Sequence, residues 1–113
     1  MATPAEQDLV VTRGDTLTVN VTMTTNGTTP INITGRTYAS QVRQFPDDPT
    51  ASASFVCTII NGSTGNLQLV MSAADTAVLD SGNYYWDLQE TASGVVSTVL
   101  AGAFVVLADV TRS

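Results

Sequence analysis

Apolar and polar residues alternate along most of this chain, and a period of two residues predicts β-strands. The clearest example is residues 16–23, where every second residue is apolar. The apolar set is Leu17, Val19, Val21 and Met23, and the polar set is Thr16, Thr18, Asn20 and Thr22. Such a segment buries one face and exposes the other, so we predict a half-buried antiparallel strand here.

The same alternation recurs in three later segments and predicts which side chains form the core. The inward residues are expected to be Phe55, Cys57 and Ile59 in the first segment, Leu67, Leu69 and Met71 in the second, and Tyr84, Trp86 and Leu88 in the third. Ile31 and Ile33 add a short apolar anchor before Gly35.

Turn-forming residues separate the alternating segments at short intervals, as is typical of all-β domains. They divide the chain into expected strands at residues 8–13, 16–23, 36–44, 52–60, 66–71, 83–91 and 95–110. We expect the last strand to be bent or bulged at Gly102. Ser72, followed three residues later by Asp75, resembles a helix capping box and predicts one or two helical turns that end before Gly82.

The predicted fold class is therefore all-β: an antiparallel β-sandwich of seven or eight strands with one short helical turn. Two sheets are expected because the apolar face of each strand must be covered by another layer. A chain of 113 residues suits a single domain, which we place at residues 8–113. Residues 1–7 are polar and contain a proline, so we predict a flexible N-terminal arm that becomes ordered on a neighbouring subunit. Ala2, Thr3 and Pro4 are then candidate partner contacts.

The charge balance excludes several classes of partner. The net charge is −6, the pI is near 4.1, and the only cationic side chains are Arg13, Arg36, Arg43 and Arg112. No basic patch is present to neutralise nucleic-acid phosphates or an anionic membrane surface, so we expect neither partner. The single cysteine, Cys57, cannot form an internal disulfide, and residues 1–8 lack the pattern of a signal peptide. Both features favour a reducing compartment or a particle that is assembled in the cytosol.

Candidate catalytic chemistry is sparse. Without histidine or lysine, a general base at neutral pH would have to be a carboxylate with a raised pKa. The adjacent pair Asp47 and Asp48 could ligate calcium, but between two prolines it is more typical of a solvated turn. Cys57 on an inward strand face is expected to be structural, and Gly14 and Asp15 are expected to shape a turn or bulge. We therefore predict a non-enzymatic protein with no catalytic residue, metal or cofactor.

Three consecutive aromatic residues, Tyr84, Tyr85 and Trp86, suggest a surface on which sugars could stack. Strand alternation, however, places Tyr84 and Trp86 on one face and Tyr85 on the other, so the three rings cannot form one platform. We predict two core aromatics and one exposed tyrosine. Tyr85 is the candidate protein contact, because exposed tyrosines favour interfaces.

The segment Asp80-Ser-Gly-Asn-Tyr84 resembles the Asp-x-Gly-x-Tyr segment of immunoglobulin-type domains. In that family a short helical turn leads into a strand whose tyrosine bonds back to the backbone, which implies structural roles for Asp80, Gly82 and Tyr84. The family places a cysteine two residues after the tyrosine, whereas this chain has Trp86. The resemblance implies an immunoglobulin-like sandwich without the inter-sheet disulfide, in which Trp86 fills the same space.

A longer ordered series resembles the small immunoglobulin-like domains of tailed-bacteriophage virions, including the N-terminal domain of baseplate upper proteins. Its members are Val11-Thr-Arg-Gly-Asp-Thr16, Pro30-Ile-Asn-Ile-Thr-Gly35, the strand from Tyr38 to Arg43, the short helix, Tyr85-Trp-Asp-Leu-Gln89, Gly102-Ala-Phe-Val-Val106 and Asp109-Val-Thr-Arg112. The resemblance implies a structural protein of the virion, made in the bacterial cytoplasm, that acts through its surfaces on other virion proteins. It also implies assembly as a homo-oligomer or in multiple copies.

Three functions remain open at this point. The first is an adaptor in the tail, baseplate or fibre, and the second is a decoration (cement) protein bound to the outside of the capsid. The third is a glycan-binding module for host attachment. Copy number per particle separates the first two, because decoration requires hundreds of copies and an adaptor only a few multiples of three or six.

Overall fold

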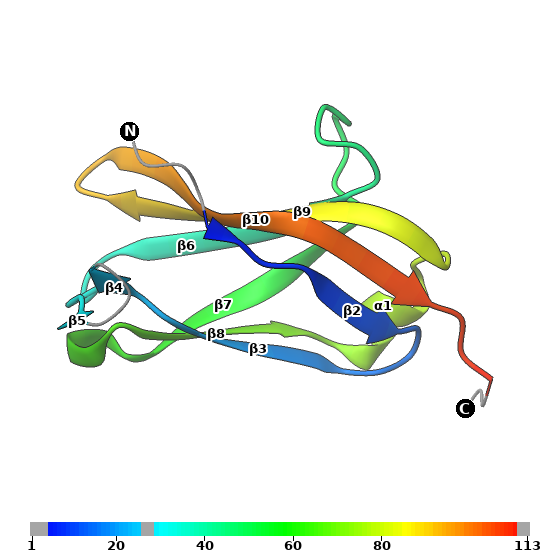
Figure 1. Cartoon of the computed structure of the whole chain (residues 1–113), viewed down its shortest axis with the longest axis horizontal. Coiled ribbons are helices and arrows are strands. Elements are labelled where there is room, and N and C mark those ends of the chain that lie inside the picture. The colour runs from blue at the N-terminus through cyan, green and yellow to red at the C-terminus, as the bar shows by residue number, and fades with distance from the viewer. Residues whose placement is uncertain (1–4, 26–28, 111–113) are drawn as a thin grey trace.

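Strands make up 59% of the computed structural model, which describes residues 5–25 and 29–110 (Figure 1). The elements in chain order are β1 (Ala5–Glu6), β2 (Leu9–Thr12), β3 (Leu17–Thr22), β4 (Thr24–Thr25), β5 (Thr29–Pro30), β6 (Thr37–Arg43), β7 (Ala53–Asn61), η1 (Gly62–Thr64), β8 (Asn66–Met71), α1 (Ala73–Ala77), β9 (Gly82–Ala92) and β10 (Val95–Leu107). The predicted all-β class is confirmed.

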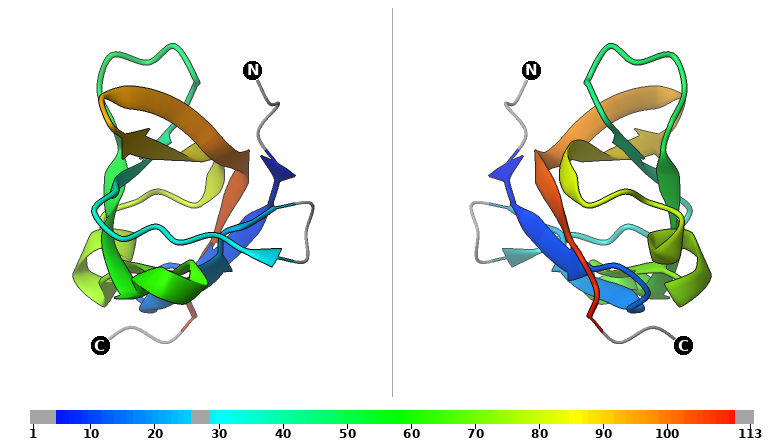
Figure 2. Two further views of the ribbon diagram at one scale, coloured as in Figure 1. Left: turned by 90° about the vertical axis from the view of Figure 1, so that its left-hand side faces the viewer. Right: turned by 90° about the vertical axis from the view of Figure 1, so that its right-hand side faces the viewer.

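One continuous sheet with the order β1-β10-β9-β6-β7-β8-β3 folds over on itself, and β2 pairs with β10 beside β1. Strands β6, β9 and β10 form one layer of the sandwich, and β3 and β8 form the other (Figures 1 and 2). Strand β7 joins them, because it pairs with β6 through Phe55 and with β8 from Val56 onward. The result is a sandwich-like sheet that nearly closes into a barrel.

The core lies between the two layers and is filled by the predicted faces. Leu67, Leu69 and Met71 of β8 are buried opposite Trp86 and Leu88 of β9. Aromatic rings form the centre of this core in edge-to-face contacts, which aromatic pairs prefer. The ring centroids are 6.0 Å apart for Phe55 and Trp86, 6.1 Å for Phe55 and Phe104, and 6.5 Å for Tyr84 and Phe104. Trp86 thus packs between the layers, as the resemblance to disulfide-bonded domains implied.

The segment that resembles immunoglobulin domains has the expected hydrogen bonds. The Tyr84 hydroxyl donates to the backbone carbonyl of Asp80 at 2.8 Å, which is the bond back to the backbone that the resemblance implied. Gly82 adopts φ of 148°, a conformation that favours glycine. The helix-capping prediction is also confirmed, since the Ser72 hydroxyl accepts from the Asp75 amide at 3.2 Å.

Gly14 and Asp15 form the turn between β2 and β3, and this turn rests on the short helix. The Gly14 amide donates to the Thr76 hydroxyl at 3.1 Å, and that hydroxyl donates to the Asp15 carbonyl at 2.7 Å. Thr76 is 0% exposed. The sequence pattern did not identify Thr76, because a threonine in a helical turn has no distinctive spacing.

Three expectations require correction. Residues 5 and 6 of the predicted arm form β1, so the sheet begins at Ala5 instead of residue 8, while residues 1–4 lie outside the described residues. Strands β1 and β2 run parallel to β10, whereas an antiparallel sandwich was expected. The irregularity in β10 lies between Thr98 and Leu100 and not at Gly102. Gly102 instead allows a close backbone approach, as described below.

We predict that Thr76→Val lowers the free energy of unfolding by about 1–3 kcal/mol, because valine keeps the shape but leaves the Gly14 amide without its acceptor. Urea unfolding followed by the fluorescence of Trp86 measures this loss. Thr58→Val is the control, because Thr58 is exposed on β7. Equal effects of the two substitutions would contradict a bonding role for Thr76.

Candidate functional site

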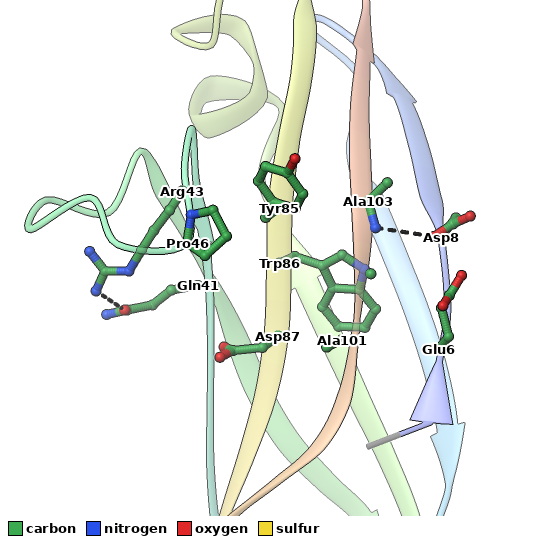
Figure 3. A pocket seen from close by; sticks show the side chains of 11 residues that line it. Glu6, Asp8, Gln41, Arg43, Pro46, Tyr85, Trp86, Asp87, Ala101 and Ala103 are labelled. Atoms are coloured by element: carbon green, nitrogen blue, oxygen red, sulfur yellow. Dashed lines mark hydrogen bonds between the residues drawn. The ribbon is translucent and has the colours of Figure 1, made fainter. Parts of the chain in front are cut away.

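A groove of about 510 Å³ lies on the outer surface of the layer formed by β6, β9 and β10. Figure 3 shows Tyr85 at its centre on β9, between the side chains of β6 and those of the N-terminal segment. The Tyr85 side chain is 48% exposed, whereas the neighbouring Trp86 is 3% exposed. The groove therefore contains the predicted contact residue Tyr85 in an exposed position.

The floor of the groove is low because β10 carries three small residues in succession. Ala103 pairs with Tyr85, Gly102 with Trp86, and Ala101 with Asp87 across the β9–β10 ladder. Larger side chains on β10 would fill the space beside the tyrosine ring. The cavity is therefore a direct result of this run of small residues.

The N-terminal segment forms one wall, and hydrogen bonds to β9 and β10 hold it in place. The Trp86 indole Nε1 donates to the Gln7 carbonyl at 2.7 Å, and the Ala103 amide donates to Asp8 Oδ1 at 3.0 Å. A Cβ atom added at Gly102 would come within 2.8 Å of the Gln7 carbonyl carbon and closer still to its oxygen. Glycine is needed at Gly102 so that the N-terminal segment can lie against β10.

The opposite wall is formed by β6 and by the loop at residues 44–52. The Arg43 guanidinium donates to the Asp48 carbonyl at 2.7 Å and to Gln41 Oε1 at 2.7 Å. These bonds fix the arginine and bring Pro46 of the loop to the edge of the groove (Figure 3). The Asp48 carboxylate accepts from the Thr50 amide at 3.1 Å, so it stabilises a turn.

The groove carries more negative than positive charge. Glu6, Asp8 and Asp87 face one cationic group, Arg43, in its lining. Burial raises the pKa of the Asp87 carboxyl above its ordinary value of 3.8, and Arg43 lowers it in part. Burial thus opposes ionisation of the Asp87 carboxyl within the groove, and perturbed carboxyl groups of this kind are common at binding sites.

A second polar cluster closes one end of the sandwich. The Tyr38 hydroxyl donates to Glu90 Oε2 at 2.6 Å, and Arg36 forms an ion pair with the same oxygen at 3.3 Å. Burial, and next the hydrogen bond to Glu90, raise the pKa of Tyr38 well above its ordinary value. Because these groups satisfy one another, the cluster is best explained as structural.

The structure separates the predicted site residues into two groups. Tyr85 and Trp86 both line the groove, although Trp86 is also buried in the core. Asp80, Gly82, Tyr84, Gly14 and Asp15 support turns or the core. Ala2, Thr3 and Pro4 lie outside the described residues. Sequence reasoning missed Asp87, Arg43, Glu6 and Asp8 as groove residues. The only signal for the groove was the run of small residues on β10, Ala101 to Ala103, which pairs with the strand that carries the aromatic residues.

Two further observations limit the chemistry of the described residues. Within residues 5–25 and 29–110, no group of three or more histidine, cysteine, aspartate or glutamate side chains is placed to hold a metal ion. In the same part of the chain, no helix combines the length and the apolar character that are required to cross a membrane.

Comparisons with known proteins give a distant structural likeness. No family model and no curated protein matches the sequence. A solved structure with a similar arrangement is that of Listeria monocytogenes InlP, with a TM-score of 0.45 and 17% sequence identity over 92% of this chain. The match covers 26% of the InlP chain, so this protein spans about a quarter of its length.

We expect Gly102→Ala to displace the N-terminal segment and to lower the free energy of unfolding by about 1–3 kcal/mol, because the added methyl group overlaps the Gln7 carbonyl. Since Trp86 is the only tryptophan, its indole N–H resonance reports directly on the bond to Gln7. Hydrogen exchange of this N–H should become faster. Ala101→Ser, which adds one atom on the groove side, should leave the exchange rate unchanged, and a slow rate in Gly102→Ala would refute the proposed contact.

Asp87→Asn should raise the melting temperature at pH 7 but not at pH 3. A raised pKa means that the folded protein binds the Asp87 proton more tightly than the unfolded chain does. The stability from this group is therefore present below the ordinary pKa and is lost as the pH rises through the raised pKa. Asparagine is uncharged, so it avoids the loss of stability that ionisation of the partly buried Asp87 carboxyl causes at pH 7. Asp47→Asn on the exposed loop controls for the change in net charge. An equal rise in both variants would contradict a specific effect at Asp87.

Proposed function

We propose that this chain is a non-enzymatic structural protein of a tailed-phage virion that acts as an adaptor in the tail, baseplate or fibre. The observation that carries the proposal is the groove at Tyr85, which is open, acidic and built on a rigid sheet. An adaptor works through such surfaces, and rigid elements hold contact residues more precisely than loops do. The ordered sequence likeness to phage virion domains supplies the biological setting.

The chemistry of the groove favours a partner segment that carries an arginine or lysine. Carboxylates on the N-terminal segment and on β9 can pair with such a cation, and the half-exposed Tyr85 ring offers a face for it. Arg43 is already bonded to Gln41 and to the backbone of Asp48, so the carboxylates of Glu6, Asp8 and Asp87 supply the main electrostatic attraction. The proposed contact is therefore between this acidic groove and a basic segment of another virion protein.

The first experiment is to locate and count the chain on purified particles, by cryo-electron microscopy with quantitative mass spectrometry. The adaptor proposal requires a few multiples of three or six copies, confined to the tail. Copies spread over the capsid would establish decoration in its place. Absence from the particle, together with a rise in melting temperature on adding a host glycan, would establish the attachment module and overturn the virion proposal.

At the level of the site, we expect Tyr85→Ala to reduce incorporation into particles by about tenfold or more, as is usual for a central interface tyrosine. Gln89→Ala is a matched control, because Gln89 is exposed on the same face of β9 but does not line the groove. Both variants should melt at the wild-type temperature. Wild-type incorporation of Tyr85→Ala would remove the groove from the contact.

A further inference from the structure

Strand β3 forms one end of the sheet, and its outer edge is open. It pairs with β8 over its full length, from Leu17 opposite Met71 to Thr22 opposite Asn66. Within the described part of the chain, no strand pairs with its other edge (Figure 1). The N–H and C=O groups along that edge of β3 therefore have no strand partner among the described residues.

Features that protect sheet edges in natural proteins are lacking in β3. Its sequence, Leu-Thr-Val-Asn-Val-Thr, contains no charge, proline or glycine, and its register with β8 has no shift. The opposite end of the sheet differs, because Gln7 and Asp8 separate β1 from β2. Glu6 at the end of β1 and Asp8 in the break also place two carboxylates there. The contrast indicates that one edge is blocked and the other is left able to pair.

The core-facing side chains of β3 lack cover on the same edge. Leu17, Val19 and Val21 are only half-buried, although the residues paired with them on β8 are Met71, Leu69 and Leu67, which are almost completely buried. Apolar side chains that remain partly in water lose part of the stabilisation that burial provides. A strand added beside β3 would cover this row.

We infer that the occupant is a second copy of this chain, which pairs β3 with β3 in antiparallel orientation about a two-fold axis. Two copies that each carry a net charge of −6 repel each other. At this edge, however, only uncharged side chains of the two copies would face each other. On the core face these are Leu17, Val19 and Val21 of each copy. On the outer face they are Thr18, Asn20 and Thr22 of each copy. A two-fold pairing uses up both open edges and ends at a dimer.

The residues next to the edge are also uncharged. On the outer face Asn20 pairs with Gln68 of β8, and Gln68 pairs with Thr58 of β7. This row gives a matched pair of test positions, because Asn20 lies at the edge and Thr58 lies two strands away on the same exposed face. The inference does not depend on the phage function or on the Tyr85 groove.

The test is sedimentation velocity of the full chain at about 10 µM to 1 mM, a range suited to a small interface. We expect a concentration-dependent dimer in the wild type. Asn20→Lys should weaken it by about tenfold or more, because it places two lysines close together across the axis. Thr58→Lys makes the same change in net charge and should leave dimerisation unchanged. Melting temperatures establish that both variants are folded.

Hydrogen exchange of the wild type gives a second readout that requires no substitution. Amides of β3 should gain protection as the concentration rises, whereas those of β9 should not. A monomer at every concentration would overturn the inference, as would larger open-ended aggregates. Loss of the dimer in both lysine variants would place the contact on the sheet face and would equally overturn pairing at the edge.

Discussion

The bond from the Trp86 indole to the Gln7 carbonyl is the interaction on which the rest of this structure depends. It joins the buried tryptophan, which packs against Phe55 between the two layers, to the N-terminal segment at the surface. A buried indole N–H needs an acceptor, and a main-chain carbonyl supplies one without burying a further polar side chain. Gly102 makes the approach possible, and one wall of the groove follows from it.

The same constraint explains why negative charge gathers at the groove. The N-terminal segment brings Glu6 and Asp8 beside β10, where they add to Asp87 and make the groove acidic. The opposite layer presents threonine, asparagine and valine along β3 and carries no charge on that strand. One surface is therefore suited to a basic partner and the other to pairing with a neutral strand. Two contacts of different chemistry would allow the protein to bind a partner and a second copy at once.

Much of the fold could be predicted because strand alternation is a local property. The inward faces of β8 and β9 followed directly from the period of two residues. The bond of Tyr84 to Asp80 spans only four residues and was implied by a short motif. The site was harder to predict: Tyr85 was identified by its exposure, but its companions Arg43 and Asp87 lie on different strands and meet only after those strands pair.

The sequence by itself determined which residues form strands, which faces are buried and where the helical turn begins, because neighbouring side chains and backbone groups set these features. Only the tertiary structure decided that β2 runs parallel to β10 and that residues 5 and 6 join the sheet. It also decided that the Gln7 carbonyl packs directly against Gly102. These features depend on contacts between segments about 95 residues apart, such as Asp8 and Ala103. No local pattern encodes which distant strands become neighbours, so the groove and the open edge emerge only from the folded chain.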